Sequence, residues 1–332
     1  MINKVTIKDI AKASGLSVST IAHSLQGRSD ISENTRQYVV ELANRMGYIR
    51  NAQASALRTG QTKTIGVITA NVANPFFSIL MQEIDECASR HDYNVLIFNS
   101  YGKVDTELKK IQQALSKNVD GLIISPAEFS GKSIDYLHTL KIPYVVIGRS
   151  AMDEQVNYVT VDDEKGSYLA TQHLIAHGRR RILYLSGDIS MPSAPYRLTG
   201  YRRALADAGI PADASLIRCL DLSPSCCERE LKALIDGKTP FDGILTFNDM
   251  VACEAFYTLY GMGIRVPEDV GLIGFDDIQR AIRVSIPLDS IGTSEKSVGE
   301  SCVEVLIRHI TNHDTPVDHV MLDVQLVDRH SA

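Results

Sequence analysis

The sequence predicts an α/β protein with a small all-α helix-turn-helix head and two Rossmann-like parallel-sheet subdomains. Two short helical segments separated by a glycine lie within the first 25 residues. From Lys63 onward, nine short apolar runs alternate with helical stretches, as in parallel sheets covered by helices. Ile65 and Ile182 stand at matching places in two of these runs, 117 residues apart. Asp120 and Asp242 do so 122 residues apart, which indicates two subdomains of one plan.

The first helix is predicted to begin after Thr6, a residue type that caps helices, and to end at Gly15. A second helix follows Ser17, and its apolar residues Ile21 and Leu25 are four positions apart, so they face the first helix. The side chains that point away are those of Val18, Ser19, Ala22 and His23. In a helix-turn-helix the second helix lies in the DNA major groove, where such side chains reach base edges.

A third helix is predicted between Ser32, its cap, and Gly47. Its apolar residues follow the spacing i, i+3, i+4 and i+7 and are Val39, Leu42, Ala43 and Met46. The three helices can therefore close a small core. Two helices around a glycine also occur in many helical domains, so their spacing alone leaves a purely structural role open.

Residues 5–64 contain TIKDIAKASGLSVSTI, SENTR, MGY and N-A-x-A-x-x-L-R-T-G-x-T in this order. This stretch closely resembles the head and hinge of lactose-repressor-type (LacI/GalR) transcription factors, and the resemblance continues through the rest of the chain. It implies a DNA-binding head at 1–50, a hinge at 51–62 and an effector-binding and dimerisation body at 63–332. It also implies DNA contacts by Thr6, Val18, Ser19, Thr20, His23, Ser32, Asn51, Ala54 and Leu57.

The hinge segment is small and polar, and by composition it is typical of a plain linker. The family resemblance implies more, because in this family the segment folds into a short helix when two subunits meet on operator DNA. Leu57 matches the leucine that enters the minor groove there. A segment that orders on binding can couple DNA affinity to the state of the body.

The end of the predicted recognition helix differs from the family pattern. Most members have S-R-V-L-N at the end of the recognition helix, where this chain has Ala22-His23-Ser24-Leu25-Gln26. The usual arginine reads guanine with two parallel hydrogen bonds, and the imidazole of His23 cannot form such a fork. We therefore expect a different operator, with base discrimination that depends more on the hinge and on DNA shape.

The charge of the chain is divided between a basic head and an acidic body. The formal net charge of −6, taken by itself, argues against a nucleic-acid partner. However, residues 1–60 hold eight Lys or Arg against four Asp or Glu, whereas the remaining residues hold 26 against 36. This distribution directs the attraction for phosphates to the helix-turn-helix.

Composition predicts a soluble, cytoplasmic protein. Hydrophobic residues make up 44% of the chain and charged residues 22%. No apolar run approaches the roughly 20 residues of a membrane span, and the opening MINKVTIKD does not resemble an export signal. The cysteines form no C-x-x-C and are expected to be reduced packing residues, although the vicinal pair Cys226-Cys227 leaves a redox or metal role open.

Catalysis and cofactor binding are not expected. The sequence contains no G-x-S-x-G, P-loop or H-E-x-x-H motif, and Gly261-Met262-Gly263 lacks the third glycine of a dinucleotide fingerprint. His173, His177 and the other histidines are taken to lack metal-ligand spacing. The chain is therefore predicted to be neither an enzyme nor a metal-binding protein.

The nine apolar runs are 64–70, 93–100, 120–126, 143–148, 157–162, 181–187, 216–222, 242–249 and 270–277. Their arrangement resembles the periplasmic-binding-protein-like type I body of the same family, in which the chain crosses three times between subdomains. We place these crossings near Asp162, Ile291 and His319. The N-subdomain then covers about 63–161 and 292–319, and the C-subdomain about 162–291 and 320–332.

Ligands of open parallel sheets bind beyond the carboxyl ends of the strands. The polar residues at these ends are Asn71, Asn74, Asp162, Asp163, Asp188, Asn248, Asp249, Asp276 and Asp277. Each by itself fits a structural role, but facing one another across a cleft, and with one arginine, such groups can hold vicinal hydroxyls. Phe76 and Phe77 can add an aromatic face, or can equally be core residues.

The candidate effector-binding residues are Phe76, Phe77, Asp163, Arg197, Asn248 and Asp276, and the family resemblance bears on four of them. Arg197 matches the arginine that contacts the effector, and Asn248 and Asp276 match the pair that binds polar groups in sugar-responsive members. Phe77 matches an aromatic position in purine- and sugar-responsive members. Gly148 stands where several sugar-responsive members carry an acid, which weakens any specific sugar assignment.

Together these observations predict a homodimeric transcription repressor that binds a pseudo-palindromic operator and responds to a sugar-like effector. A tetramer, a purine- or nucleoside-responsive regulator, and control by a phosphorylated protein partner remain alternatives. A solute-binding transport protein is the rival from another class, but it requires an export signal and no basic head.

Overall fold

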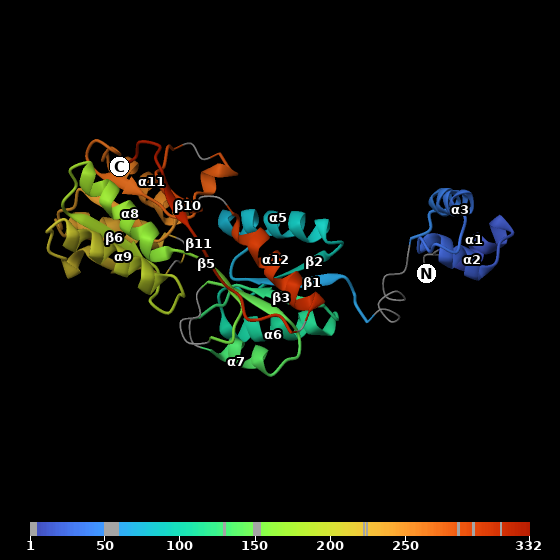
Figure 1. Cartoon of the computed structure of the whole chain (residues 1–332). Coiled ribbons are helices and arrows are strands. Elements are labelled where there is room, and N and C mark those ends of the chain that lie inside the picture. Colours follow the sequence, from blue (N-terminus) through green and yellow to red (C-terminus); the bar gives the residue numbers. More distant parts are fainter. Residues whose placement is uncertain are drawn as a thin grey trace. The chain divides into compact units, whose positions relative to one another are not determined.

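The computed structural model describes residues 5–49, 60–128, 131–148, 154–221, 223, 225–283, 286–293, 296–312 and 314–332. The chain divides into two compact units, Met1–Thr62 and Lys63–Ala332 (Figure 1). Among the described residues, the first unit contains helices and no strand, and the second contains all the strands.

The head consists of three helices, α1 (Ile7–Ser14), α2 (Val18–Leu25) and α3 (Glu33–Arg45). Thr6, Ser17 and Ser32 cap them as predicted, each by accepting a backbone N–H from the first turn. Gly15 closes α1 at φ +71°, a left-handed conformation that glycine adopts without strain. The predicted apolar positions form the core, which centres on Ile10, Ala11, Ile21, Val39 and Ala43.

The first sheet of the body is parallel throughout and has the order β11-β5-β4-β3-β1-β2. Its strands are β1 (Thr64–Thr69), β2 (Asn94–Asn99), β3 (Gly121–Ile124), β4 (Tyr144–Ile147), β5 (Tyr158–Val161) and β11 (His319–Leu322). The inner strands β1, β3 and β4 are short and mostly buried. Each is rich in Val and Ile because both of its faces are covered.

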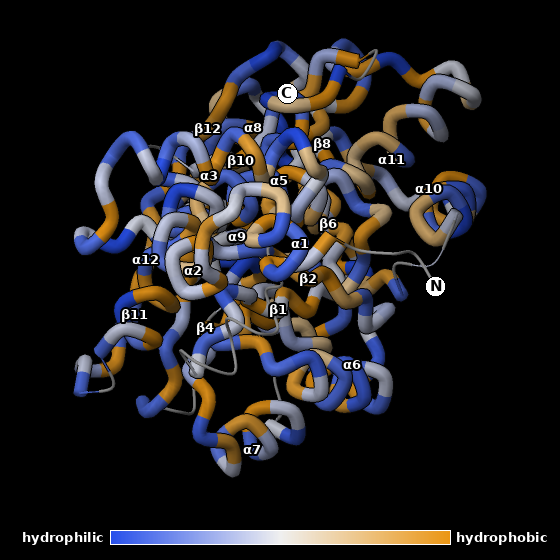
Figure 2. The backbone as a smooth tube through the Cα atoms, turned by 90° about the vertical axis from the view of Figure 1, so that its right-hand side faces the viewer, coloured by the Kyte–Doolittle hydropathy of each residue, from blue (hydrophilic) through white to orange (hydrophobic). Residues whose placement is uncertain are grey.

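Helices cover both faces of this sheet (Figure 1). One face packs against α5 (Pro75–Arg90) and α12 (Val298–Thr311), and the other against α6 (Val104–Ser116) and α7 (Lys132–His138). The covering helices are amphipathic, as the alternation of hydrophobic and hydrophilic residues along α6 shows (Figure 2). The first subdomain therefore has two hydrophobic cores, one on each face.

The second sheet is also parallel, with the order β7-β6-β8-β9. Its strands are β6 (Ile182–Ser186), β7 (Ile217–Cys219), β8 (Gly243–Thr246) and β9 (Gly271–Ile273). The covering helices are α8 (Asp163–Ala176) and α9 (Ala194–Asp207) on one face, and α10 (Cys226–Asp236) and α11 (Asp249–Gly261) on the other. Two 3₁₀ turns, η1 (Ala214–Leu216) and η2 (Ile278–Arg280), complete this subdomain. All nine predicted runs are thus strands.

Three further strands were not predicted. β10 (Ser290–Thr293) and β12 (Val324–Val327) form an antiparallel pair that packs against the second subdomain. β11 pairs in parallel with β5, with Leu322 opposite Val161. Residues 320–322 therefore belong to the first sheet, and the chain crosses to the second subdomain after Leu322. The crossing thus lies slightly after the one predicted near His319, because the residues of β11 are mostly exposed or half-buried and form no continuous apolar run.

Candidate functional site

The outer face of α2 presents small side chains. Val18 is 47% exposed and Ser19 is also exposed, whereas Thr20 is half-buried. The Oγ atom of Ser17 lies 2.8 Å from both the Ser19 and the Thr20 hydroxyl oxygens. The N-terminal end of this helix therefore offers one apolar branched side chain and a connected set of hydroxyls, which suit thymine methyl groups and single hydrogen bonds to base edges.

His23 is held by a partner that the sequence did not reveal. Its Nδ1 atom lies 2.7 Å from Oδ2 of Asp30, in the loop after α2. Because the carboxylate only accepts hydrogen bonds, Nδ1 carries the proton and Nε2 is the ring nitrogen that remains for another partner. The ring orientation is thus fixed by Asp30.

Two other predicted DNA-contacting residues, Thr6 and Ser32, are exposed N-caps of α1 and α3. Helix N-termini of this kind are suited to phosphate groups. Thr6 also forms a capping box with Asp9, and the Thr6 hydrogen bonds hold the pKa of Asp9 below its usual value. The predicted contacts Asn51, Ala54 and Leu57, and the hinge helix that contains them, lie outside the described residues.

The body contains a cleft of about 760 Å³ between the carboxyl ends of its two sheets. The first subdomain contributes Asn71, Asn74, Phe76, Phe77 and Gly148 to its wall, and the second contributes Asp163, Arg197, Asn248 and Asp276. The structure therefore brings all six candidate effector-binding residues to one cleft. The volume is suited to a small metabolite.

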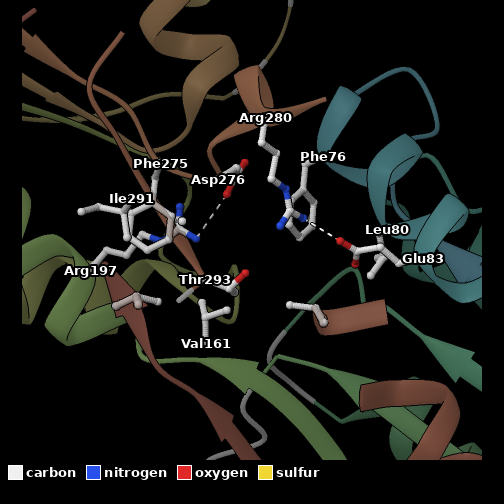
Figure 3. A pocket seen from close by; sticks show the side chains of 13 residues that line it. Phe76, Leu80, Glu83, Val161, Arg197, Phe275, Asp276, Arg280, Ile291 and Thr293 are labelled. Atoms are coloured by element: carbon white, nitrogen blue, oxygen red, sulfur yellow. Dashed lines mark hydrogen bonds and ion pairs between the residues drawn. The ribbon is translucent and has the colours of Figure 1, made fainter. Parts of the chain in front are cut away.

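Arg197, on α9, is the centre of the polar wall. It is 7% exposed, and its Nε atom donates to Oδ1 of Asp163 at 2.8 Å. Its Nη1 atom donates to the carbonyl oxygen of Phe247, and Nη2 lies 3.8 Å from Oδ1 of Asp276 (Figure 3). The guanidinium also lies 3.5 Å from the ring centre of Phe275. These contacts leave the guanidinium a single orientation.

Burial governs the charges of this cluster. It raises the pKa of Asp163, although Arg197 acts in the opposite direction, and it raises the pKa of Asp276 well above its usual value. Burial also acts to lower the pKa of Arg197, but the two carboxylates outweigh this effect and the net shift is upward. The wall therefore combines a permanent cation with two carboxyl groups whose pKa values are raised, and it can donate and accept hydrogen bonds.

The sequence suggested that the asparagines of the cleft accept hydrogen bonds from a ligand, but their amide oxygens already accept backbone N–H groups. Oδ1 of Asn248 accepts the N–H of Val251 at the start of α11, and Oδ1 of Asn74 accepts the N–H of Phe76 at the start of α5. Oδ1 of Asn71 is used by the N–H of Ala73. What these side chains present to a ligand is therefore their NH₂ groups, which are donors.

Phe76 and Phe77 line the cleft and also belong to the core, so both interpretations left open by the sequence apply. Their rings meet edge to face with centroids 5.3 Å apart, and both line the cleft. Both also pack against the core beneath α5. The pair can thus offer an aromatic surface that is held in place by the core.

A small pocket of about 60 Å³ adjoins this wall, and an ion pair crosses it from one subdomain to the other (Figure 3). Nη2 of Arg280, on η2, donates to Oε1 of Glu83, on α5, at 2.7 Å. Oε2 of Glu83 accepts the N–H of Gly299. The sequence carried no signal for this clasp between Arg280 and Glu83, since the two residues are far apart in the chain.

Several other polar strand-end residues have structural roles. Asp249 is completely buried and accepts from Ser290 Oγ at 2.6 Å and from the N–H of Ile278 at 2.8 Å. Asp188 binds its own turn through the N–H of Ser190 and does not line the cleft. Gly148 has φ +100°, and a Cβ there would lie 3.5 Å from Pro192 of the opposite subdomain. An acidic side chain at this position would be strained.

The vicinal cysteines are buried on α10, and burial raises the pKa of both thiols, which makes them poor nucleophiles. His173, on α8, is not isolated as the sequence suggested, because ligand-type atoms of Asp289 and Asp328 lie within 4.8 Å of one of its ring nitrogens, whereas His177 is the C-cap of the same helix. Among the described residues, no helix has the length and apolar character needed to cross a membrane.

Comparisons with known proteins agree with this architecture. Residues 6–51 match the family model described as bacterial regulatory proteins, lacI family. Residues 62–329 match the model described as periplasmic binding proteins and sugar binding domain of LacI family.

Relatives match over nearly their full length. The HTH-type transcriptional regulator DegA of Bacillus subtilis is 31% identical and covers 99% of this chain and 98% of its own. The HTH-type transcriptional repressor PurR of Aliivibrio salmonicida is 28% identical over 92% of each chain. The solved complex of the transcriptional regulator CelR with cellobiose has a TM-score of 0.74 at 26% identity and covers 99% of this chain and all of its own. The chain therefore belongs to the LacI family of DNA-binding transcriptional regulators, and it is not an enzyme.

Proposed function

We propose that the chain is a homodimeric repressor that binds a pseudo-palindromic operator and is controlled by a small polyhydroxylated effector in the cleft of the body. The head, at 1–50, supplies base contacts through Val18, Ser19, Thr20 and His23 and backbone contacts through the helix ends at Thr6 and Ser32. Residues 51–62 act as the hinge, and Asn51, Ala54 and Leu57 supply its DNA contacts. DNA as the partner places the protein in the cytoplasm.

The observation that carries the effector proposal is the buried cluster of Arg197, Asp163 and Asp276 opposite an aromatic pair. A sugar hydroxyl is both a donor and an acceptor, so it can bind a carboxyl oxygen and an amide or guanidinium N–H at once. The apolar face of a sugar ring can lie on Phe76 or Phe77. The CelR complex with cellobiose supports a sugar, and a purine or nucleoside is the second candidate, as the sequence left open.

We place the edge strand β2 in the interface between two copies of the chain. Leu96 is 36% and Ile97 is 51% exposed on this strand, an unusual position for aliphatic side chains. A dimer would cover them and would bring two heads to the two half-sites of an operator. Replacement of Ile97 by Glu should convert the dimer to a monomer in analytical ultracentrifugation, whereas Glu at exposed Val317 should not.

Selection of binding sites from random duplex DNA at moderate salt tests the DNA-binding half of the proposal. The expected product is one palindromic consensus, and binding without sequence preference in the presence of a metabolite panel would contradict it. Isothermal titration of the full chain with sugars, sugar derivatives and purines tests the effector half. Binding that is lost in Asp276→Asn but kept in Asp188→Asn, a strand-end acid outside the cleft, is the expected result.

The hinge-based switch is the mechanism that we propose. An effector that changes the relative position of the two subdomains changes the spacing of the two hinges and so the free energy of folding them on DNA. An operator affinity that no cleft ligand alters would instead favour control by a phosphorylated protein partner.

A further inference from the structure

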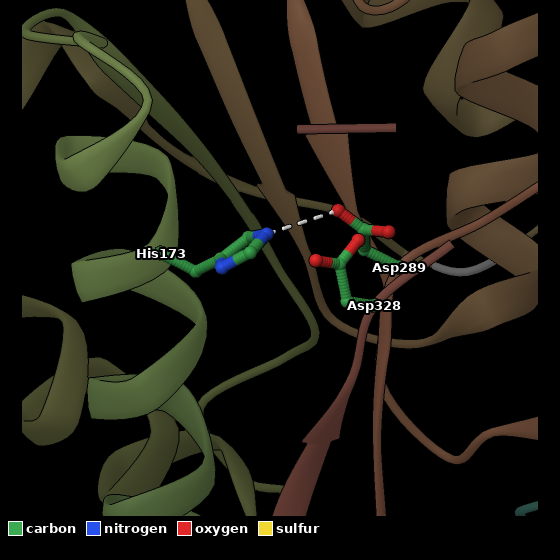
Figure 4. Close-up of side chains that lie close together, drawn as sticks. All are labelled: His173, Asp289 and Asp328. Carbon is green, nitrogen blue, oxygen red and sulfur yellow. Dashed lines mark ion pairs between the residues drawn. The ribbon is translucent and has the colours of Figure 1, made fainter. Parts of the chain in front are cut away.

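Three ligand-type side chains from separate segments meet in the second subdomain, outside the effector cleft (Figure 4). His173 lies on α8, Asp289 lies between β9 and β10, and Asp328 follows β12. One nitrogen or oxygen atom of each lies within 4.8 Å of the corresponding atoms of the other two. The imidazole and the two carboxylates converge on one point (Figure 4).

The contact between His173 and Asp289 lacks the geometry of a hydrogen bond. Nε2 of His173 and Oδ2 of Asp289 are 3.3 Å apart and buried, and neither has a hydrogen-bond partner within the described residues. Two other pairs of the chain do form such bonds, His23 with Asp30 at 2.7 Å and His309 with Asp318 at 3.1 Å. A fully buried carboxylate oxygen without a hydrogen-bond partner is costly, and a cation bound between Nε2 and Oδ2 would remove this cost.

The 3.3 Å separation is the one expected for two ligands of a single ion. Nitrogen and oxygen ligands lie about 2.0–2.2 Å from Zn²⁺, and the tetrahedral angle then places two ligand atoms about 3.3–3.5 Å apart. The carboxylate of Asp289 is also oriented for this role, since its Oδ1 accepts the N–H groups of Arg329 and Ser331. Such outer contacts aim the other oxygen at the ion.

The local charges favour a divalent cation. Asp289 and Asp328 bring two carboxylates together, and the guanidinium of the adjacent Arg329 is engaged by Asp277 and by the carbonyl oxygen of Leu288. Two further imidazoles face the group: the ring of His177 lies 4.4 Å from that of His173, and Nδ1 of His330 lies 3.3 Å from Oδ1 of Asp328, so an ion at Asp328 competes with His330. Asp328 is exposed, which gives an ion a path from solvent and leaves room for a water ligand. One imidazole, two carboxylates and water form a donor set that Zn²⁺ and related ions accept.

We propose that His173, Asp289 and Asp328 form a binding site for a divalent transition-metal ion, with Zn²⁺ as the preferred ion. The ion ties α8 to the β9–β10 connection and to the segment after β12. Its role is to stabilise the second subdomain, and it takes no part in effector binding.

Titration of the EDTA-treated and dialysed full chain with ZnCl₂ tests the site. The expected result is one tight equivalent in calorimetry and a rise in unfolding temperature with Zn²⁺. His173→Gln and Asp328→Asn should weaken binding by at least about tenfold, because even loss of an outer-shell partner has an effect of about 10–100-fold. Asp328 is exposed, so its variant is expected to fold.

Two matched controls keep the result specific. His309→Gln removes an imidazole from another His–Asp pair, and Cys219→Ser removes the exposed thiol. Both should bind Zn²⁺ like the wild type. The proposal is overturned if the wild-type chain binds no Zn²⁺, in which case a proton alone neutralises the pair, or if His173→Gln binds it unchanged.

Discussion

Arg197 and Asp163 form a buried ion pair in the wall of the cleft, with Nε 2.8 Å from Oδ1 and each side chain 8% exposed. The two residues come from α9 and α8, which pack against each other. The pair fixes the guanidinium before any ligand arrives, and its Nη2 atom faces Asp276. Such preorganisation reduces the entropy that a ligand must lose to order the site.

Replacement of Arg197 by Gln should destabilise the body by about 3–5 kcal/mol, because it leaves the buried carboxylate of Asp163 without its partner. The matched control is Arg203→Gln on the same helix, whose pair with Glu164 is partly exposed and whose loss should be about 1 kcal/mol or less. Urea denaturation of both variants measures the difference. Equal losses of unfolding free energy in the two variants would contradict a larger contribution of the buried ion pair to stability.

The stability of the body should depend on pH through Asp249. Burial raises the pKa of this carboxyl from 3.8 to about 7. Between these values the folded chain keeps a proton that the unfolded chain has lost. The free energy of unfolding therefore falls by about 1.4 kcal/mol per pH unit as the pH rises from about 4 to about 7. Above pH 7 the contribution of Asp249 to the free energy of unfolding no longer changes with pH.

Asp249→Asn lacks this titration and is the reference. Urea denaturation at several pH values should show the wild type losing stability relative to the variant up to neutral pH. A constant difference between the two chains across this range would contradict the assignment.

Loss of the clasp between Arg280 and Glu83 should loosen the two subdomains. Glu83→Gln removes the charge while its amide oxygen can still accept the N–H of Gly299. A loss of about 1 kcal/mol changes a conformational ratio about fivefold, so the mean radius of gyration in small-angle scattering should increase. Arg90→Gln is the control, because Arg90 pairs with Glu300 inside one subdomain and its loss should leave the radius unchanged.

His23 and Asp30 should together set one base preference of the head. His23→Arg should introduce a guanine preference at a single position of each half-site, since arginine can form the bidentate contact that histidine cannot, worth about 1–3 kcal/mol. Asp30→Asn should weaken the original preference without creating a new one, because Asn no longer fixes which ring nitrogen carries the proton. Site selection with each variant checks both outcomes, and an unchanged consensus for His23→Arg would contradict a base contact at this position.

Gly200 should tolerate no side chain. A Cβ at this position would lie 2.1 Å from the carbonyl oxygen of Glu164, because α9 packs against α8 here. Gly200→Ala should therefore destabilise the chain by several kcal/mol or prevent folding. Gly261→Ala is the control, since nothing lies within 4 Å of its Cβ and alanine is the better helix residue by about 1 kcal/mol. Thermal unfolding of both variants is the measurement.

Much of the fold was predictable because its signals are local. The caps Thr6, Ser17 and Ser32 act within one helical turn, and the apolar spacing of the head follows directly from the period of the helix. Strands such as β3, β6 and β8 stand out as continuous apolar runs because both of their faces are covered. The strands β11 and β12 were missed because their four residues have mixed exposure, and β10 was missed because Ser290–Thr293, although largely buried, contains a single large apolar residue, Ile291.

By itself, the sequence determined the head, the order of the strands along the chain, and the strand ends at which a ligand can bind. Only the tertiary structure decided which polar residues at those ends face the cleft. Asp276 meets Arg197 there, whereas Asp249 is buried against Ser290, and the amide oxygen of Asn248 is used by a helix cap. The physical reason is that burial and partner choice depend on how helices distant in sequence pack together, which the local pattern of residues does not encode.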